Sequence, residues 1–218
     1  MSSPKPAKRD DNARALFTID EQERIAAAIG QAEKSTSGEI VAVVARESGS
    51  YLYVPLLWAS LIALLVPWPL IFFTWMPVQT IFLIQLAVFL GLLIALLPQP
   101  VRLSLVPRSV KRARAHRHAV EQFLAQSLHT TEGRTGVLVF VSVAERYAEV
   151  LADTGIASKV PAATWQEVVD RLTARIGEGR AADGFIEAIH GVGGHLAAHF
   201  PPGSADPNEL PNKLIVLD

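Results

Sequence analysis

The sequence predicts an α/β fold: a small Rossmann-like αβα domain interrupted by a two-helix transmembrane hairpin. Two observations lead to this fold class. Residues 51–101 carry no charge of either sign, although the rest of the chain is ordinarily polar. On either side of that run, strands that are apolar on both faces alternate with amphipathic helices, which is typical of a parallel sheet covered by helices.

The composition limits the classes of protein that the chain can belong to. Its 218 residues are 50% hydrophobic and 19% charged, and a mean hydropathy of +0.29 indicates a partly membrane-embedded chain. The formal net charge of −1 provides no global field that would recruit nucleic acid. Because the chain has no cysteine, disulfides, thiolate metal sites, iron–sulfur clusters and cysteine nucleophiles are excluded.

The first folded elements precede the apolar run. Residues 1–15 lack an apolar h-region, so we expect a disordered polar leader rather than a signal peptide. Thr18 and Glu21 form a capping box that begins a helix, and this helix ends near Lys34. Residues 39–45, EIVAVVA, follow a short turn and predict a buried strand.

The apolar run, residues 51–101, is too long for one membrane span, which needs about 20 residues. Prolines and polar residues in WPLIFFTWMPVQT break it, so we expect spans at about 52–73 and 78–97 joined by the turn TWMPV. The alternative is a hairpin buried inside a large soluble protein. A soluble core of this size could not cover two such segments, so the transmembrane interpretation is preferred.

A dense positive cluster follows the apolar run directly. Lys and Arg beside a membrane span stay on the cytoplasmic side, so we expect a multi-pass inner (plasma) membrane protein with its soluble domain and both termini in the cytoplasm. The expected partners are the lipid bilayer, whose anionic headgroups these cations can contact, and a membrane or membrane-proximal protein. A nucleic-acid interface would interleave aromatic residues, so no nucleic-acid partner is expected. The cluster contains no acid, and its cations are Arg102, Arg108, Lys111, Arg112, Arg114 and Arg117.

Beyond the hairpin, the pattern again alternates helices with strands and ends in an irregular, proline-broken tail over 201–218. The expected elements are helix 110–128, buried strand 136–143, antiparallel edge strand 147–153, a helix from Trp165 to about Ile176 capped by Thr164, and helix 181–200.

The two soluble segments predict one domain, because a lone buried strand cannot satisfy its backbone hydrogen bonds. We therefore expect a discontinuous domain made of residues 16–50 and 105–200, with the hairpin of residues 51–101 inserted in it. Strand 39–45, helix 110–128 and strand 136–143 would form a βαβ crossover. Two independent domains flanking a membrane anchor are the alternative.

Three motifs carry a family resemblance. Ser37-Gly38-Glu39-Ile40 opens the first strand, Gly136-Val137-Leu138 opens the second, and ERYAEVLADTGI forms the following turn and strand. On these motifs the chain resembles the TPM-domain family over about residues 16–50 and 105–200. The resemblance implies a TPM-type α/β domain. It also implies two chemistries, since some family members are similar to weak acid phosphatases and some bind calcium at an acidic surface cluster.

The chain departs from the family pattern at the places that imply calcium. The family's Asp-Asn-Gly before the second strand is here Arg134-Thr135-Gly136, and its Asp-Arg at the next turn is Glu145-Arg146. The later Gly-x-Gly-Leu-Glu is replaced by residues 153–157, DTGIA, which lacks the glutamate. Calcium needs several hard oxygen ligands, so we expect no cofactor, calcium being the one that the resemblance implies.

Four charged residues are the candidate ligand or metal residues. Glu39, Glu145 and Asp153 are expected to converge near strand ends, where α/β sheets often bind ligands, and Arg134 nearby could hold an anion. The alternative interpretation, which we prefer, is that these are solvated turn residues. No catalytic residue is identified.

Other motifs predict less. His195 and His199, four residues apart on the last helix, could share a metal, but an ordinary helix surface is favoured. Residues 191–194, GVGG, lack the preceding strand and third glycine of a dinucleotide fingerprint and indicate close helix packing instead. Ser142 and Ser158 lack a nucleophile-elbow context.

Two functions remain open from the sequence. The first is a non-catalytic, membrane-anchored binding or accessory module. The second is a weak phosphatase-like hydrolase acting near the membrane, although no activated nucleophile is assembled in the sequence. Transport is disfavoured, because two helices without intramembrane charge provide no pathway.

Overall fold

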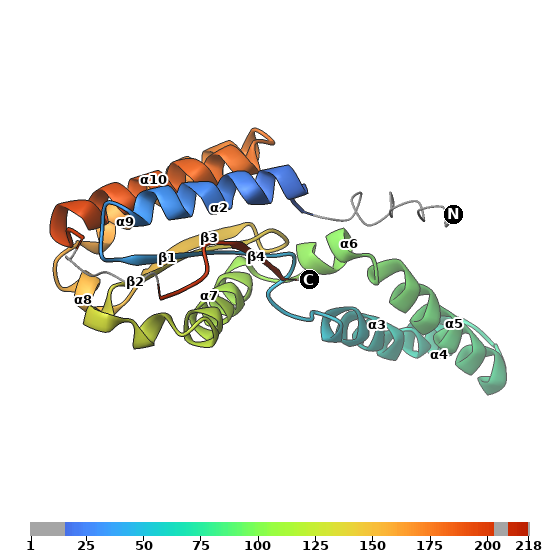
Figure 1. The fold of residues 1–218 in the computed structure, drawn as a ribbon. Helices are drawn as coiled ribbons and strands as arrows, with labels where there is room; N and C mark the ends of the chain where they lie inside the picture. The colour runs from blue at the N-terminus through green and yellow to red at the C-terminus, as the bar shows by residue number, and fades with distance from the viewer. Residues whose placement is uncertain (1–15, 203–208, 218) are drawn as a thin grey trace, which may run out of the picture. The chain divides into compact units, whose positions relative to one another are not determined.

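The computed structural model describes residues 16–202 and 209–217, and the predicted leader over 1–15 lies outside these residues. The chain divides into two compact units, Met1–Ser48 with Ala115–Asp218 and Gly49–Arg114. The first unit contains a four-stranded sheet with strand order β3-β2-β1-β4 (Figure 1). Its strands are β1 (Glu39–Ala45), β2 (Gly136–Ser142), β3 (Tyr147–Ala152) and β4 (Leu214–Leu217).

Helices cover both faces of this sheet. α2 (Ile19–Glu33), α9 (Ala162–Gly177) and α10 (Ala181–His199) lie on one face, and the C-terminal part of α7 (Arg108–Ala125) lies on the other (Figure 1). Side chains that alternate along β1 and β2 therefore enter two separate cores, one under each helix layer. The predicted αβα fold class is confirmed.

Strands β1 and β2 are parallel, with Glu39 opposite Gly136 and Ala45 opposite Ser142. Every residue of both strands is buried, as the two-faced apolar pattern predicts. β3 then pairs antiparallel with β2 and is only partly buried, as an edge strand should be. The predicted pairing of the first two strands across the α7 crossover is therefore present.

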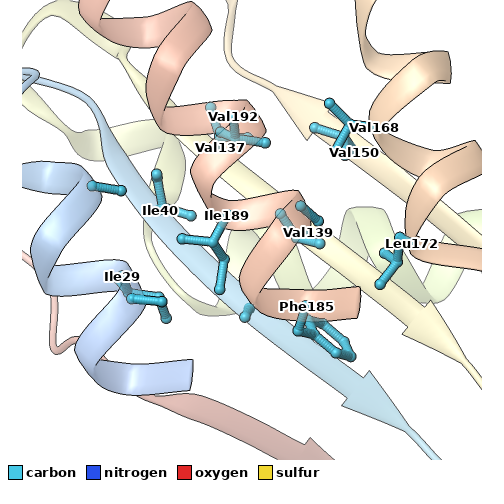
Figure 2. Close-up of a cluster of buried hydrophobic side chains, with 14 of the residues drawn as sticks. Ile29, Ile40, Val137, Val139, Val150, Val168, Leu172, Phe185, Ile189 and Val192 are labelled. Atoms are coloured by element: carbon cyan, nitrogen blue, oxygen red, sulfur yellow. The ribbon is translucent and has the colours of Figure 1, made fainter. Parts of the chain in front are cut away.

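The larger core lies between the sheet and the helices α2, α9 and α10. Figure 2 shows Phe185 and Ile189 of α10 among Ile29, Ile40 and Val139 of the neighbouring elements. Phe185 and Ile189 are completely buried. Burial of such a side chain stabilises the fold by roughly 1.5–3 kcal/mol, so this cluster is a principal source of stability.

The helix boundaries agree with the sequence at one N-terminus and differ at another. The capping box of α2 is present, with Thr18 N donating to Glu21 Oε2 at 2.8 Å. α9, however, begins at Ala162 with Pro161 at its N-cap, whereas the sequence predicts a start at Trp165 capped by Thr164. Two alanines, which favour helix, extend it by almost one turn beyond the predicted cap.

The irregular tail expected over 201–218 is wrong for its last described residues. Leu214–Leu217 forms β4, which pairs parallel with the free edge of β1 from Ala42 to Ala45. Pro211 and earlier prolines break the preceding segment, but LIVL itself is a short apolar run suited to a strand. Pairing satisfies backbone groups on β1 that would otherwise lie at an open edge.

Short helices occupy the loops between these elements. Two 3-10 helices, Leu128–Thr130 and Glu132–Arg134, precede β2, and α8 (Thr154–Ala157) follows β3. Gly136 opens β2 where the chain passes very close to the first of them, since a Cβ at this position would lie 2.5 Å from Leu128 O. Only glycine fits this approach.

The second unit is a pair of apolar segments with a short helix after them. Its helices are α3 (Tyr53–Leu65), α4 (Pro67–Phe73), α5 (Val78–Leu96) and α6 (Gln99–Ser104), followed by the first turns of α7. The first segment is interrupted at Val66 because Pro67 begins a new helix. Tyr53–Phe73 and Val78–Leu96 are long and apolar enough to be candidate membrane spans.

Candidate functional site

Three of the four predicted ligand residues lie at one end of the sheet, where strands β1 and β2 begin. Glu39 is the first residue of β1, and its backbone N donates to Thr135 O at 3.2 Å. Because β3 runs antiparallel to β2, its last residues return to the same end of the sheet, where Asp153 N donates to Gly136 O at 2.9 Å. Arg134 Nη1 lies 4.0 Å from Asp153 Oδ2.

The carboxylate of Asp153 already has a structural role. It is 6% exposed, and its Oδ1 accepts from Thr154 N at 2.6 Å and from Thr154 Oγ1 at 3.1 Å, which caps α8. Arg134 is mostly exposed and adopts a left-handed backbone with φ of 56°. A cation therefore lies beside a buried carboxylate that already caps α8.

A pair of carboxylates, the half-buried Glu33 and the buried Glu39, lies nearby between α2 and β1. Glu39 Oε1 accepts from Glu209 N at 3.0 Å, and Glu33 Oε1 accepts from Ile40 N at 2.9 Å. Burial raises the pKa of Glu33 to about 7, and the Glu39 charge adds to the rise, while hydrogen bonds from Ile40 N and the Asn212 side chain oppose it. Glu33 therefore exchanges its proton near neutral pH.

The sequence analysis did not identify Glu33, although a signal was available. The buried face of α2 includes Ile25 and Ile29 at helical spacing. Glu33 follows Ile29 by four residues, and side chains at this spacing lie on the same face. A carboxylate on the continuation of a buried stripe is a candidate for a raised pKa.

Glu145 lies at the opposite end of the strands, so the expected convergence with Glu39 and Asp153 does not occur. It follows the end of β2, and the seven residues of that strand separate the two ends of the sheet by roughly 20 Å. Glu145 Oε1 accepts from Ser48 N at 3.0 Å, and Oε2 accepts from Ser142 Oγ. Its buried carboxylate thus ties together the loops that leave β1 and β2.

A hydroxyl and imidazole network extends from Glu145. Ser48 Oγ donates to Ser142 Oγ at 2.7 Å, and His118 Nδ1 of α7 lies 3.3 Å from Ser48 Oγ. The His118 ring also packs against Phe140, with ring centroids 5.6 Å apart. These contacts join α7 to the ends of β1 and β2. Ser48 belongs to no sequence motif and His118 is the last residue of the basic cluster, so no local pattern pairs them.

Two residues of the remaining motifs of the last helix, His195 and Gly193, make packing contacts. The rings of His195 and Trp165 pack in a T-shaped arrangement with centroids 6.0 Å apart, whereas His190 and His199 are exposed. Over the described part of the chain, no three His, Cys, Asp or Glu side chains are grouped to hold a metal. A Cβ at Gly193 would lie 2.8 Å from Ala32 Cβ, so this glycine of the 191–194 motif allows α10 to approach α2 closely, as the sequence predicts.

The six cations of the basic cluster differ in exposure and contacts. Arg108, Arg112 and Arg117 are exposed, whereas Arg102, Lys111 and Arg114 are half-buried. Arg114 Nη1 donates to Ser50 O at 2.8 Å, and Lys111 Nζ donates to Leu103 O at 3.2 Å. Some of the predicted membrane-surface residues thus make contacts inside their own unit.

Comparison with known proteins gives a match to a family model over part of the chain and a similar fold. Residues 101–195 match the family model described as the TPM domain. The NMR structure of the BA42 protein from the psychrophilic bacterium Bizionia argentinensis is similar to this chain with a TM-score of 0.60 and 19% identity, covering 94% of this chain and 99% of that one. No curated protein matches the chain.

Proposed function

Given that this chain carries a TPM domain, as its sequence motifs predict, we propose that it is a membrane-anchored, non-catalytic binding or accessory module at the inner membrane. The TPM match alone assigns no activity, because it indicates a domain of unclear function. In the proposal, the second unit crosses the bilayer twice. The soluble domain and both termini lie in the cytoplasm and bind a membrane or membrane-proximal protein.

The dimensions and exposure of the apolar segments support the anchor. Tyr53–Phe73 has 21 residues and Val78–Leu96 has 19, so at about 1.5 Å per residue they extend over roughly 31 and 28 Å, close to the hydrocarbon thickness of a bilayer. Only 11% and 6% of their most apolar windows are buried. Two helices that expose this much apolar surface need an apolar solvent or partner.

Aromatic residues lie near both ends of the first segment. Tyr53 begins α3, and Trp68 stacks on Phe72 in α4 with ring centroids 6.1 Å apart. Trp75, in the turn between the segments, is fully exposed. Aromatic side chains of this kind are enriched at the two membrane–water interfaces, so their placement fits a hairpin whose turn reaches the far interface.

The observation that carries the non-catalytic part is the contact between Arg134 and Asp153, 4.0 Å apart. A cation stands beside the buried carboxylate that a calcium ion or metal-bound water would need. Asp153 already caps α8, and Glu39 already accepts from the backbone of Glu209. The carboxylates at this end of the sheet support the fold, which favours a binding surface over a hydrolytic centre.

The topology can be tested with single introduced cysteines, because the natural chain has none. Met76→Cys lies in the hairpin turn, and a cysteine added after Asp218 marks the C-terminus. We expect a membrane-impermeant maleimide to label position 76 in intact cells, and the C-terminal position only after lysis. Labelling of the C-terminus in intact cells would refute the proposed orientation.

The activity is tested with the purified full chain and a generic phosphate ester, with and without calcium. We expect no hydrolysis above that of a detergent blank, and recovery of a specific protein by pull-down from mildly solubilised native membranes. Hydrolysis that Glu145→Gln or Asp153→Asn abolishes would replace the binding module with the phosphatase-like hydrolase.

A further inference from the structure

The basic cluster that follows the hairpin contains two groups of cations with different surroundings. We infer that Arg108 and Arg112 bind the headgroups of anionic phospholipids, whereas Lys111 and Arg114 hold the base of the hairpin together. This inference rests on the proposed membrane anchoring and names a lipid class that the anchored chain would select. It assigns different roles to neighbouring residues of one helix.

Lys111 and Arg114 are committed to contacts within the second unit. The Arg114 guanidinium donates to Ser50 O at 2.8 Å and lies over the rings of Tyr51 and Tyr53, at 4.8 and 5.2 Å from their centroids. Lys111 Nζ donates to Leu103 O in α6 at 3.2 Å. Cation–π contacts with a desolvated ring are stronger than those at exposed sites, and Tyr51 is completely buried.

These contacts close the hairpin at its polar end. Tyr51, just before α3, packs with Val54 and with Val106, just before α7. The chain entering the first apolar segment therefore meets the chain leaving the second beside the start of α7. A bilayer that contains the hairpin would have its headgroup layer at this junction.

Arg108 and Arg112 extend from the same junction but are exposed. They are four residues apart on α7, so they lie on one face of the helix at roughly 40° to each other. Within the part of the chain that the structure describes, neither guanidinium makes a hydrogen bond or an ion pair. The sequence from 102 to 118 also contains no acid that could neutralise them.

The chemistry of this pair matches a phosphate diester. A guanidinium presents a planar set of donors that binds phosphate oxygens in a fork, and it is more weakly hydrated than an ammonium group. Two arginines on an open helix face form no enclosed pocket for a free anion. They are instead continuous with the apolar spans, so lipids held in the bilayer would meet them at high local concentration.

The test uses the full chain in neutral detergent and native mass spectrometry with equal amounts of phosphatidylglycerol and phosphatidylcholine. We expect the wild type to retain phosphatidylglycerol preferentially. Arg108→Gln with Arg112→Gln should reduce that preference by roughly 5-fold per arginine, about 30-fold for the pair, with an unchanged melting temperature. Arg117→Gln is the matched control, because Arg117 is nine residues from Arg108 and lies on the opposite face of α7.

The outcomes separate this inference from the proposed anchoring. Equal retention of the two lipids by the wild type, an unchanged preference in the double variant, or an equal loss in Arg117→Gln would overturn it. Displacement of the lipid by inorganic phosphate at constant ionic strength would also overturn it, in favour of a free-anion site. Anchoring is measured independently by alkaline carbonate extraction, in which wild type and double variant should both stay with the membrane; release of the wild type would refute the anchor itself.

Discussion

Glu33 provides a sharp test of the electrostatics at the start of the sheet. Replacing it with glutamine removes its titration but keeps an oxygen that can accept from Ile40 N, which Glu33 Oε1 does at 2.9 Å. Burial is the main cause that raises the pKa of this carboxyl from 4.5 to about 7, and the charge of Glu39 adds to it. The charged form of Glu33 is therefore the one that the folded state disfavours.

The sign of the pH dependence follows from proton linkage. Below pH 4.5 the carboxyl is protonated in both states and the penalty is absent. Between 4.5 and about 7 the folded state holds the proton while the unfolded state loses it, so stability falls as pH rises. Above about 7 the penalty is complete and constant.

The size of the effect can be bounded. A difference of about 2.5 between the two pKa values (7 − 4.5) corresponds to roughly 3 kcal/mol. Glu33 is only partly buried, so solvent screening reduces this to roughly 1–2 kcal/mol. The free energy of unfolding of the wild type should thus fall by that amount more than that of Glu33→Gln between about pH 4 and about pH 8.

Urea unfolding in mild detergent, followed by circular dichroism at both pH values, measures this difference. Glu23→Gln is the matched control, because Glu23 lies on the exposed face of the same helix, and it should keep the pH dependence of the wild type. If Glu33→Gln lost as much stability with rising pH as the wild type, the burial of a charged Glu33 would not be the cause.

Three further predictions concern side-chain packing and the end of the sheet where Glu145 lies. Gly193→Ala should lower the melting temperature because its Cβ would lie 2.8 Å from Ala32 Cβ, whereas Gly194→Ala, which meets nothing within 4 Å, should raise stability by about 0.5–1 kcal/mol. Phe185→Ala should cost about 3–5 kcal/mol in chemical unfolding because the ring is fully buried; a loss below about 1 kcal/mol would contradict its central place in the core. Glu145→Ala should cost about 1–3 kcal/mol and increase amide exchange in the loops after β1 and β2, since it leaves their buried donors unpaired; unchanged exchange would show that the carboxylate does not hold those loops.

Local patterns were sufficient for most of the fold. The capping box at Thr18 and the two-faced apolar strands predicted α2, β1 and β2, because helix caps and strand burial depend on residues close in sequence. Pairing of β1 and β2 followed from backbone hydrogen bonds that neither strand could satisfy alone, and the helical crossover between them predicted the parallel direction. The start of α9 was wrong because several weak signals compete within one turn.

The candidate site could be predicted only in part. Glu39 and Asp153 lie at strand ends, as expected. The direction of each strand, however, decides at which end of the sheet its terminal residues lie, and Glu145 is about a strand length away from the other two. The raised pKa of Glu33 needed burial by neighbouring elements, together with the charge of Glu39. Such burial brings together residues far apart in the chain, so no local pattern contains it.

By itself, the sequence determined the apolar hairpin, the alternation of helices and strands, the TPM resemblance and the absence of cysteine chemistry. Each of these depends on composition or on spacing within a few turns of chain. Only the tertiary structure decided that LIVL near the C-terminus completes the sheet, and that Arg114 is held over two tyrosine rings while Arg108 and Arg112 are exposed. The physical reason is that partners of a strand edge or a guanidinium are chosen in space, by whichever distant segment the fold brings within hydrogen-bonding distance.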